Sequence, residues 1–150
     1  LAVFNSDIGI GLNIEKGTLA DVPELNDVNY APAGTTPLYD AIGLSIDSLE
    51  EVQGQVLFII LTDGEENASQ QFDKEEILKR ISNRTEQGWK FVFLGCDIDA
   101  MKQSEDLGIA PGNARSYSRA ESQGVMCDVA SATVEYSLRS PRDERGFFEK

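Results

Sequence analysis

The feature that most constrains this chain is an unbroken apolar run, Val56–Leu61, that stops at Thr62-Asp63-Gly64. A strand whose side chains are all apolar is typical of a parallel sheet that is covered on both faces. The aspartate–glycine pair suits a sharp backbone turn at the point where the strand ends. We therefore expect an α/β domain in which Asp63 lies at the carboxyl edge of the sheet.

Other segments supply the remaining layers of such a domain. Leu1–Phe4 and Phe91–Leu94 are expected to be buried strands, and the alternation of Ile8, Ile10, Leu12 and Ile14 predicts an edge strand. Apolar residues at helical spacing predict helices from Leu38 to Leu49, from Asp73 towards Gly88, from Asp99 to Leu107 and from Ser122 to Leu138. This order predicts a Rossmann-like fold, with a mostly parallel central sheet, helices on both faces and one antiparallel edge strand.

The chain has the size of one compact domain, at 150 residues. We expect that domain to span residues 1–138, and the charged segment 139–150 to form a tail or a junction. No apolar stretch approaches the length of a membrane span, so we expect no membrane association.

Composition excludes several functional classes. The net charge of −13 argues against nucleic acid and anionic membranes as partners. The absence of histidine removes Ser-His-Asp and Cys-His nucleophiles and imidazole zinc sites, so we expect no enzyme of those kinds. The two cysteines, Cys96 and Cys127, do not make a disulfide framework, which favours a reducing, cytoplasmic location.

Two segments rich in oxygen ligands are expected to meet at the carboxyl edge of the sheet, where open parallel sheets bind ligands. One is Gly34–Asp40, which contains Thr36, and the other is Leu61–Glu66, which contains Asp63. Hydroxyl and carboxylate groups without imidazole or thiolate suit a hard cation such as Mg²⁺, Mn²⁺ or Ca²⁺. Each segment also has a purely structural interpretation: Thr36 before Pro37 suits a helix N-cap, and Asp63-Gly64 suits a turn. Glu65 and Glu66 are expected to be solvated loop charges.

These patterns resemble the von Willebrand factor A (vWA) family. Gly34–Ile42 resembles the threonine loop of that family, and Val56–Gly64 resembles its central strand with the metal-site aspartate. Leu1–Asn5 is similar to the family's second strand, and Trp89–Gly95 to the next core strand of its bacterial and phage members. The resemblance covers roughly residues 1–138. It implies a metal-ion-dependent adhesion site to which Thr36 and Asp63 belong, and a protein partner that offers an acidic residue to the cation.

The chain departs from the family at one point. Family members open with a central strand that ends in Asp-x-Ser-x-Ser and supplies further metal ligands, and this motif does not occur here. We therefore expect the central first strand to be absent from this chain and to come from an upstream segment or from another chain, because a gap would leave unpaired backbone groups. Thr36 and Asp63 alone give few ligands, so metal binding by this fragment is expected to be weak.

Two other functions remain open. One is Mg²⁺-dependent phosphoryl transfer by the strand-end aspartates Asp63 and Asp97, with Asp99 either a ligand or a helix cap. The other is a structural interaction domain whose metal site has decayed, which the missing motif favours.

Overall fold

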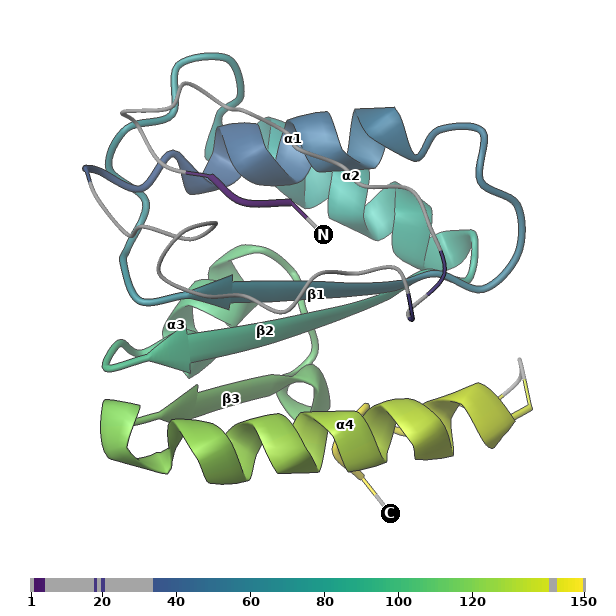
Figure 1. Cartoon of the computed structure of the whole chain (residues 1–150). Coiled ribbons are helices and arrows are strands. Elements are labelled where there is room, and N and C mark those ends of the chain that lie inside the picture. The colour runs from purple at the N-terminus through teal and green to yellow at the C-terminus, as the bar shows by residue number, and fades with distance from the viewer. Residues whose placement is uncertain (1, 5–17, 19, 21–33, 141–142, 150) are drawn as a thin grey trace. The chain divides into compact units, whose positions relative to one another are not determined.

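The computed structural model describes residues 2–4, 18, 20, 34–140 and 143–149 (Figure 1). The chain forms two compact units. The first contains Leu1–Glu51 and Glu66–Asp73, and the second contains Val52–Glu65 and Lys74–Lys150. Each unit is described below by itself.

The second unit is built on a three-stranded parallel sheet. Its strands β1 (Leu57–Thr62), β2 (Lys90–Cys96) and β3 (Ala114–Tyr117) lie in the order β1-β2-β3. The two apolar strands that the sequence predicts are confirmed as parallel neighbours, in the register Leu57↔Lys90. Together with the helices, this sheet makes the fold α/β. Strand β3 was not predicted, because Ala-Arg-Ser-Tyr is short and has neither an apolar run nor an alternating pattern.

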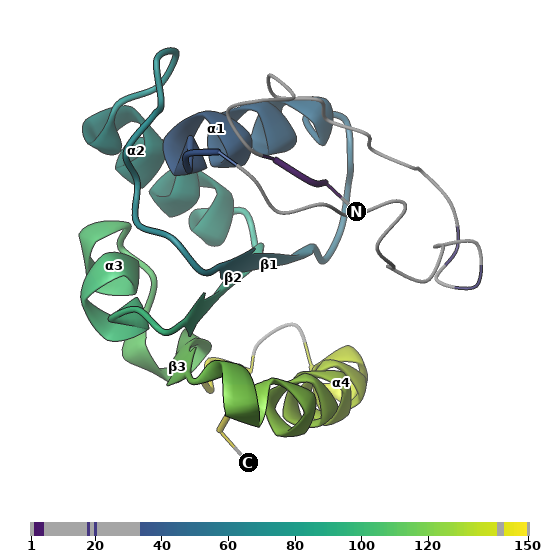
Figure 2. The same ribbon diagram turned by 60° about the vertical axis from the view of Figure 1, so that its left-hand side comes forward.

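Helices cover both faces of this sheet. Two of them, α2 (Lys74–Glu86) and α3 (Ala100–Asp106), connect successive strands and share one face, as right-handed crossovers in one direction require. An ion pair of 2.7 Å between Lys74 and Asp106 links these two helices. Helix α4 (Ser122–Leu138) lies on the opposite face from α3 (Figure 2). Two short 3-10 turns, η2 (Pro111–Asn113) and η3 (Arg119–Glu121), flank β3.

The core beneath α4 includes a residue from the end of the chain. Val92 and Leu94 of β2 and Phe147 are fully buried there, and Val129 and Tyr136 of α4 pack against them. The Phe147 N–H donates a hydrogen bond of 2.6 Å to the side chain of Asn113, which fixes this segment beside η2. The segment 139–150, for which the sequence predicted a charged tail or a junction, thus places an aromatic side chain in the core.

Strand β1 is only partly covered. Its Ile60 and Thr62 are buried, whereas Ile59 and Leu61 on the other face are 38% and 48% exposed. The sequence prediction that this strand is covered on both faces is therefore wrong. The reason is that the core beneath α4 is centred on Val92 and Leu94 of the neighbouring strand β2, and Leu57 at the start of β1 is the β1 residue that packs against it. Within the described residues, β1 is also one of the two edge strands of the sheet.

The first unit contains helix α1 (Leu38–Ser48) and the loop Glu66–Asp73. The predicted helix is confirmed, and its buried residues lie along one face. Residues 2–4 carry no strand, so the predicted strand Leu1–Phe4 is not formed there; a strand needs a hydrogen-bonded neighbour, and the described sheet contains none for it. The predicted edge strand at 8–14 lies outside the described residues. Within the described ranges, no helix has the length and apolar character needed to cross a membrane.

Candidate functional site

The three strands of the second unit end at one edge of the sheet, and each end carries a polar side chain. Asp63 follows β1, Asp97 follows β2, and Tyr117 closes β3. Because the strands are parallel and Cys96 lies level with Tyr117, these groups gather at the carboxyl edge. This is the part of an open parallel sheet where ligands bind.

Asp63 projects from this edge because of a tight turn. The Thr62 hydroxyl donates to the Gly64 carbonyl (2.9 Å) and accepts from the Gly64 N–H (3.2 Å), so it closes the turn around Asp63. Thr62 is buried, whereas the Asp63 side chain is 60% exposed. This carboxylate forms an ion pair with Arg119, whose guanidinium nitrogen Nη2 lies 3.8 Å from Asp63 Oδ2. Asp63 is therefore accessible to a ligand from solvent.

Asp97 joins the ends of β2 and β3. Its backbone has a positive φ of 56°, a conformation that aspartate adopts more readily than most residues. Its N–H donates to the Tyr117 carbonyl (2.8 Å), and its Oδ1 accepts from the Arg119 N–H at 3.4 Å. The Cys96 thiol lies 3.8 Å from Oδ2. The carboxylate of Asp97 thus orders the loop that follows β3.

The charges of both aspartates affect the ionisation of Tyr117. Burial raises the pKa of Tyr117 to about 12, and Cys96 and the carboxylates of Asp63 and Asp97 act in the same direction. The hydroxyl therefore stays protonated at neutral pH. Sequence analysis missed Tyr117 and Arg119, because β3 itself carries no recognisable pattern.

Asp99, the second aspartate of the Asp-x-Asp pair, is a helix cap. Its side chain accepts a hydrogen bond of 3.1 Å from the Lys102 N–H at the start of α3. The capping alternative for Asp99 is thereby confirmed. This use of its oxygen weakens the case for a paired-aspartate Mg²⁺ site of the phosphoryl-transfer type.

Thr36 lies in the first unit, immediately before α1. Asn67 holds its backbone from both sides: the Thr36 N–H donates to Asn67 Oδ1 (2.8 Å), and the Thr36 carbonyl accepts from the Asn67 N–H (3.2 Å). The alternative that Thr36 caps the helix is wrong, because Pro37 occupies the N-cap position. The Tyr39 and Asp40 N–H groups are instead satisfied by Glu66 Oε2 (2.9 Å) and Ser69 Oγ (3.0 Å).

Two carboxylates of the first unit act as structural acceptors. Asp40, 3% exposed, accepts the backbone N–H groups of Gln70, Gln71 and Phe72, each at 2.8 Å. Glu66 accepts from Tyr39, Ala68 and Ser69. Burial opposes ionisation of Glu66, but these hydrogen bonds outweigh it and hold its pKa below the ordinary value of 4.5. The expectation that Glu66 is a solvated loop charge is therefore wrong.

The residues present meet only part of what a cation needs. Thr36 belongs to the first unit and Asp63 to the second. Hydroxyl and carboxylate oxygens are the donor types that Mg²⁺ prefers, but that ion takes about six ligands. Among the described residues, no group of three or more Asp, Glu, Cys or His side chains could hold a metal ion. The donor chemistry fits, and the number of donors falls short.

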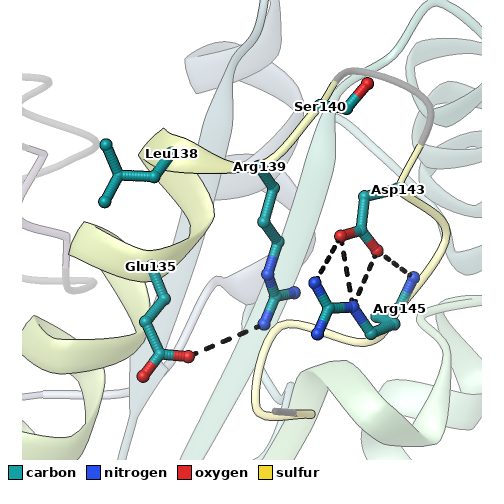
Figure 3. A pocket seen from close by; sticks show the side chains of 6 residues that line it. All are labelled: Glu135, Leu138, Arg139, Ser140, Asp143 and Arg145. Atoms are coloured by element: carbon teal, nitrogen blue, oxygen red, sulfur yellow. Dashed lines mark hydrogen bonds and ion pairs between the residues drawn. The ribbon is translucent and has the colours of Figure 1, made fainter.

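A concave surface lies at the C-terminal end of α4 (Figure 3). This hollow of about 440 Å³ is lined by Glu135, Leu138, Arg139, Ser140, Asp143 and Arg145. Its guanidinium groups are already engaged: Arg145 pairs with Asp143 at 2.6 Å, and Arg139 donates to the carbonyls of Gly146 and Glu149. The hydrogen bonds from Arg145 lower the pKa of Asp143 to about 2. These contacts secure the end of the chain and leave the carboxyl edge as the better candidate site.

Comparison of the chain with known protein families, with characterised proteins and with solved structures finds no match.

Proposed function

We propose that this chain is a metal-ion-dependent protein-binding module of the vWA type, and not an enzyme. The observation that carries the proposal is the exposed Asp63 carboxylate, held at the carboxyl edge of a parallel sheet by the Thr62 turn. The resemblance of Gly34–Ile42 and Val56–Gly64 to the two metal-site segments of that family supports it.

Thr36 and Asp63 are the residues that would hold the cation. When bound, a Mg²⁺ or Mn²⁺ ion would supply a positive centre that accepts a carboxylate from the partner protein. The chain's own residues prepare this site. Asn67 fixes the backbone of Thr36, and the Thr62 hydroxyl orients the turn that exposes Asp63. The remaining oxygen ligands would come from an upstream segment or from another chain, so this chain alone should bind cations weakly.

The strand that completes the sheet is part of the same proposal. Strand β1 is apolar along its length, yet Ile59 and Leu61 are substantially exposed. Exposed apolar edge strands invite pairing with a further strand. We propose that a strand from an upstream segment or from another chain pairs with this edge and brings the missing ligands beside Asp63.

A titration with Mn²⁺, followed by NMR, tests the cation site in the chain as it stands. A paramagnetic ion broadens the amide signals nearest to it, so even weak binding can be mapped. We expect selective broadening at Asp63-Gly64 and at Thr36, and we expect Asp63→Asn to abolish it. Glu75→Gln is the matched control, because it removes one exposed carboxylate from α2 and should leave the broadening unchanged.

Other outcomes would contradict the proposal in distinct ways. Broadening spread over the acidic surface, and equal in Asp63→Asn, would favour an interaction domain whose metal site has decayed. Broadening at Asp63 without any at Thr36 would show that the two residues do not share one ion. Hydrolysis of a generic aryl phosphate that depends on Asp63 or Asp97 would favour the phosphoryl-transfer enzyme.

A further inference from the structure

Part of the sheet face beside α4 is apolar and open to solvent. Ile59 and Leu61 of β1 lie level with Val92 and Leu94 of β2, so all four side chains point to the same face of the sheet. Val92 and Leu94 are buried beneath α4, whereas Ile59 and Leu61 are substantially exposed. Helix α4 therefore leaves the β1 side of this face uncovered.

The side of α4 that faces this open area is apolar as well. Asp128 of α4 pairs with Arg115 of β3 at 2.6 Å, so the side of the helix that carries Asp128 faces β3. Met126 precedes Asp128 by two residues and lies about 200° away around the helix, on the side towards β1. Ala130 and Val134 follow Met126 at intervals of four residues and continue this apolar side outwards.

The most exposed large apolar side chains of the described residues also belong to α4. They are Val134 and Leu138, at 61% and 82% exposed. The charged residues of α4, Asp128 and Glu135, are seven positions apart and share the side that faces β3. A helix that is apolar around most of its circumference is normally buried by neighbours. The exposed apolar residues form one α4–β1 surface, which consists of Ile59, Leu61, Met126, Ala130, Val134 and Leu138.

The charge of the chain favours this surface for contact between two copies. Each copy carries a net charge of −13, so contacts through its charged surfaces would bring carboxylates close together. None of the residues that form the α4–β1 surface is charged. Two copies can therefore meet there without pairing like charges, and salt screens the repulsion between the rest of their surfaces.

The α4–β1 surface is also large enough for a reversible dimer. Helix α4 has 17 residues, which makes it about 25 Å long. Contact along this length, with one helix and one strip of sheet as neighbours, covers on the order of 500 Å² on each copy, or about 1,000 Å² in total. This estimate is close to the lower limit of about 1,000 Å² for a specific interface.

We propose that a second copy of this chain covers the α4–β1 surface in a twofold-symmetric dimer. Val134 and Leu138 of each copy lie against Ile59 and Leu61 of the other, so the same surface supplies both halves of the contact. The two α4 helices lie side by side between the two sheets. The dimer covers the face of β1 and leaves its backbone edge free, and it does not depend on the proposed cation site.

Sedimentation velocity over a range of concentrations tests the dimer. We expect a reversible monomer–dimer equilibrium that shifts towards dimer as NaCl is added, because salt screens the repulsion between acidic copies. Val134→Lys should raise the dissociation constant at least about ten-fold, because it buries an ammonium group without a partner. It also reduces the net negative charge of each copy by one, so added repulsion cannot explain the loss. Leu78→Lys is the matched control, because Leu78 is an exposed leucine of α2, on the other face of the sheet.

Isotope-filtered NOEs in a mixture of labelled and unlabelled chains show which residues meet. NOEs between Val134 or Leu138 of one copy and Ile59 or Leu61 of the other would support the proposed arrangement. A chain that stays monomeric at NMR concentrations and high salt would overturn the proposal. A dimer that persists in Val134→Lys, or that is weakened equally by Leu78→Lys, would show that another surface associates. NOEs between the β1 backbones of two copies would replace the proposed contact with pairing of strand edges.

Discussion

The N–H of Phe72 donates a hydrogen bond of 2.8 Å to Asp40 Oδ1, across 32 positions of the sequence. Together with the N–H groups of Gln70 and Gln71, it joins the first turn of α1 to the loop Glu66–Asp73. Asp40 lies within the segment that resembles a metal-binding loop, yet its carboxylate is occupied by the backbone. Within the first unit, this residue is a structural one.

Asp40→Asn should loosen that loop. An amide has one acceptor oxygen in place of two, and its NH₂ group would face N–H donors that then lack a partner. We expect a loss of about 2–3 kcal/mol in local stability, the scale for hydrogen bonds to a buried charged group. Hydrogen exchange at the amides of Gln70, Gln71 and Phe72 measures it directly. Glu50→Gln changes an exposed carboxylate after α1, and equal exchange in the two variants would refute the structural role.

Two glycines in helices should respond in opposite ways to alanine. A Cβ at Gly43 of α1 would stand 2.6 Å from the ring of Phe72, whereas a Cβ at Gly124 of α4 would meet nothing within 4 Å. Overpacking costs about 1–3 kcal/mol, and alanine gains up to about 1 kcal/mol over glycine in a helix. We therefore expect Gly43→Ala to destabilise α1 and Gly124→Ala to stabilise α4 by about 0.5–1 kcal/mol. Amide exchange in the two helices checks both signs, and a stabilised α1 would show that the Phe72 ring moves aside.

Phe147 should contribute as much to the stability of the second unit as a core residue of the sheet. It is fully buried against Val92 and Leu94, so Phe147→Ala should cost about 3–5 kcal/mol. Urea unfolding followed by the fluorescence of Trp89, the one tryptophan of the chain, reports on the same unit. Phe148→Ala, at a half-buried neighbour, should cost clearly less. Similar losses for both variants would contradict the packing described here.

Glu66 should make the free energy of unfolding depend on pH in the acidic range. Its folded-state pKa lies below the ordinary 4.5, so the folded chain favours the ionised carboxylate more than the unfolded chain does. The stabilisation is complete above pH 4.5 and is lost as the pH falls through the lowered pKa. Thermal unfolding measured between pH 7 and pH 3 should show that the unmodified chain has a higher Tm than Glu66→Gln. This difference in Tm should become smaller as the pH falls. A difference in Tm that stays constant over this pH range would contradict the lowered pKa of Glu66.

Local patterns predicted the elements that carry strong signals. The apolar run Val56–Leu61 and the helical spacing up to Leu138 predicted a strand and a helix close to those observed, although β1 is covered on one face only and Val125 is the one buried residue of α4. β3 left no such signal, since its four residues are placed by pairing with β2 and not by their own composition. Its position depends on tertiary structure, which a short window of sequence does not contain.

The candidate site was predictable to a similar extent. Asp63 could be placed at the strand end, because a parallel sheet fixes which edge the turn after β1 occupies. Arg119 could not, because its approach to Asp63 depends on the Asp97 contact and the Ser118–Glu121 turn. Glu66 looked like a surface charge in an acidic loop, and its role depends on Tyr39, 27 positions earlier.

The hydrogen bonds that close the start of α1 also bear on when this helix can form. Its first N–H groups are satisfied by Glu66 and Ser69, 27 and 29 positions downstream, and not by a neighbouring side chain. During synthesis, α1 would leave the ribosome before the residues that accept its first N–H hydrogen bonds. Those hydrogen bonds could form only after the loop Glu66–Asp73 had been synthesised. Closing a loop of this length lowers the conformational entropy of the chain before any of these hydrogen bonds can stabilise it. Because Asp40 and Phe72 are 32 positions apart, we expect the start of α1 to become stable only after this loop has folded against it.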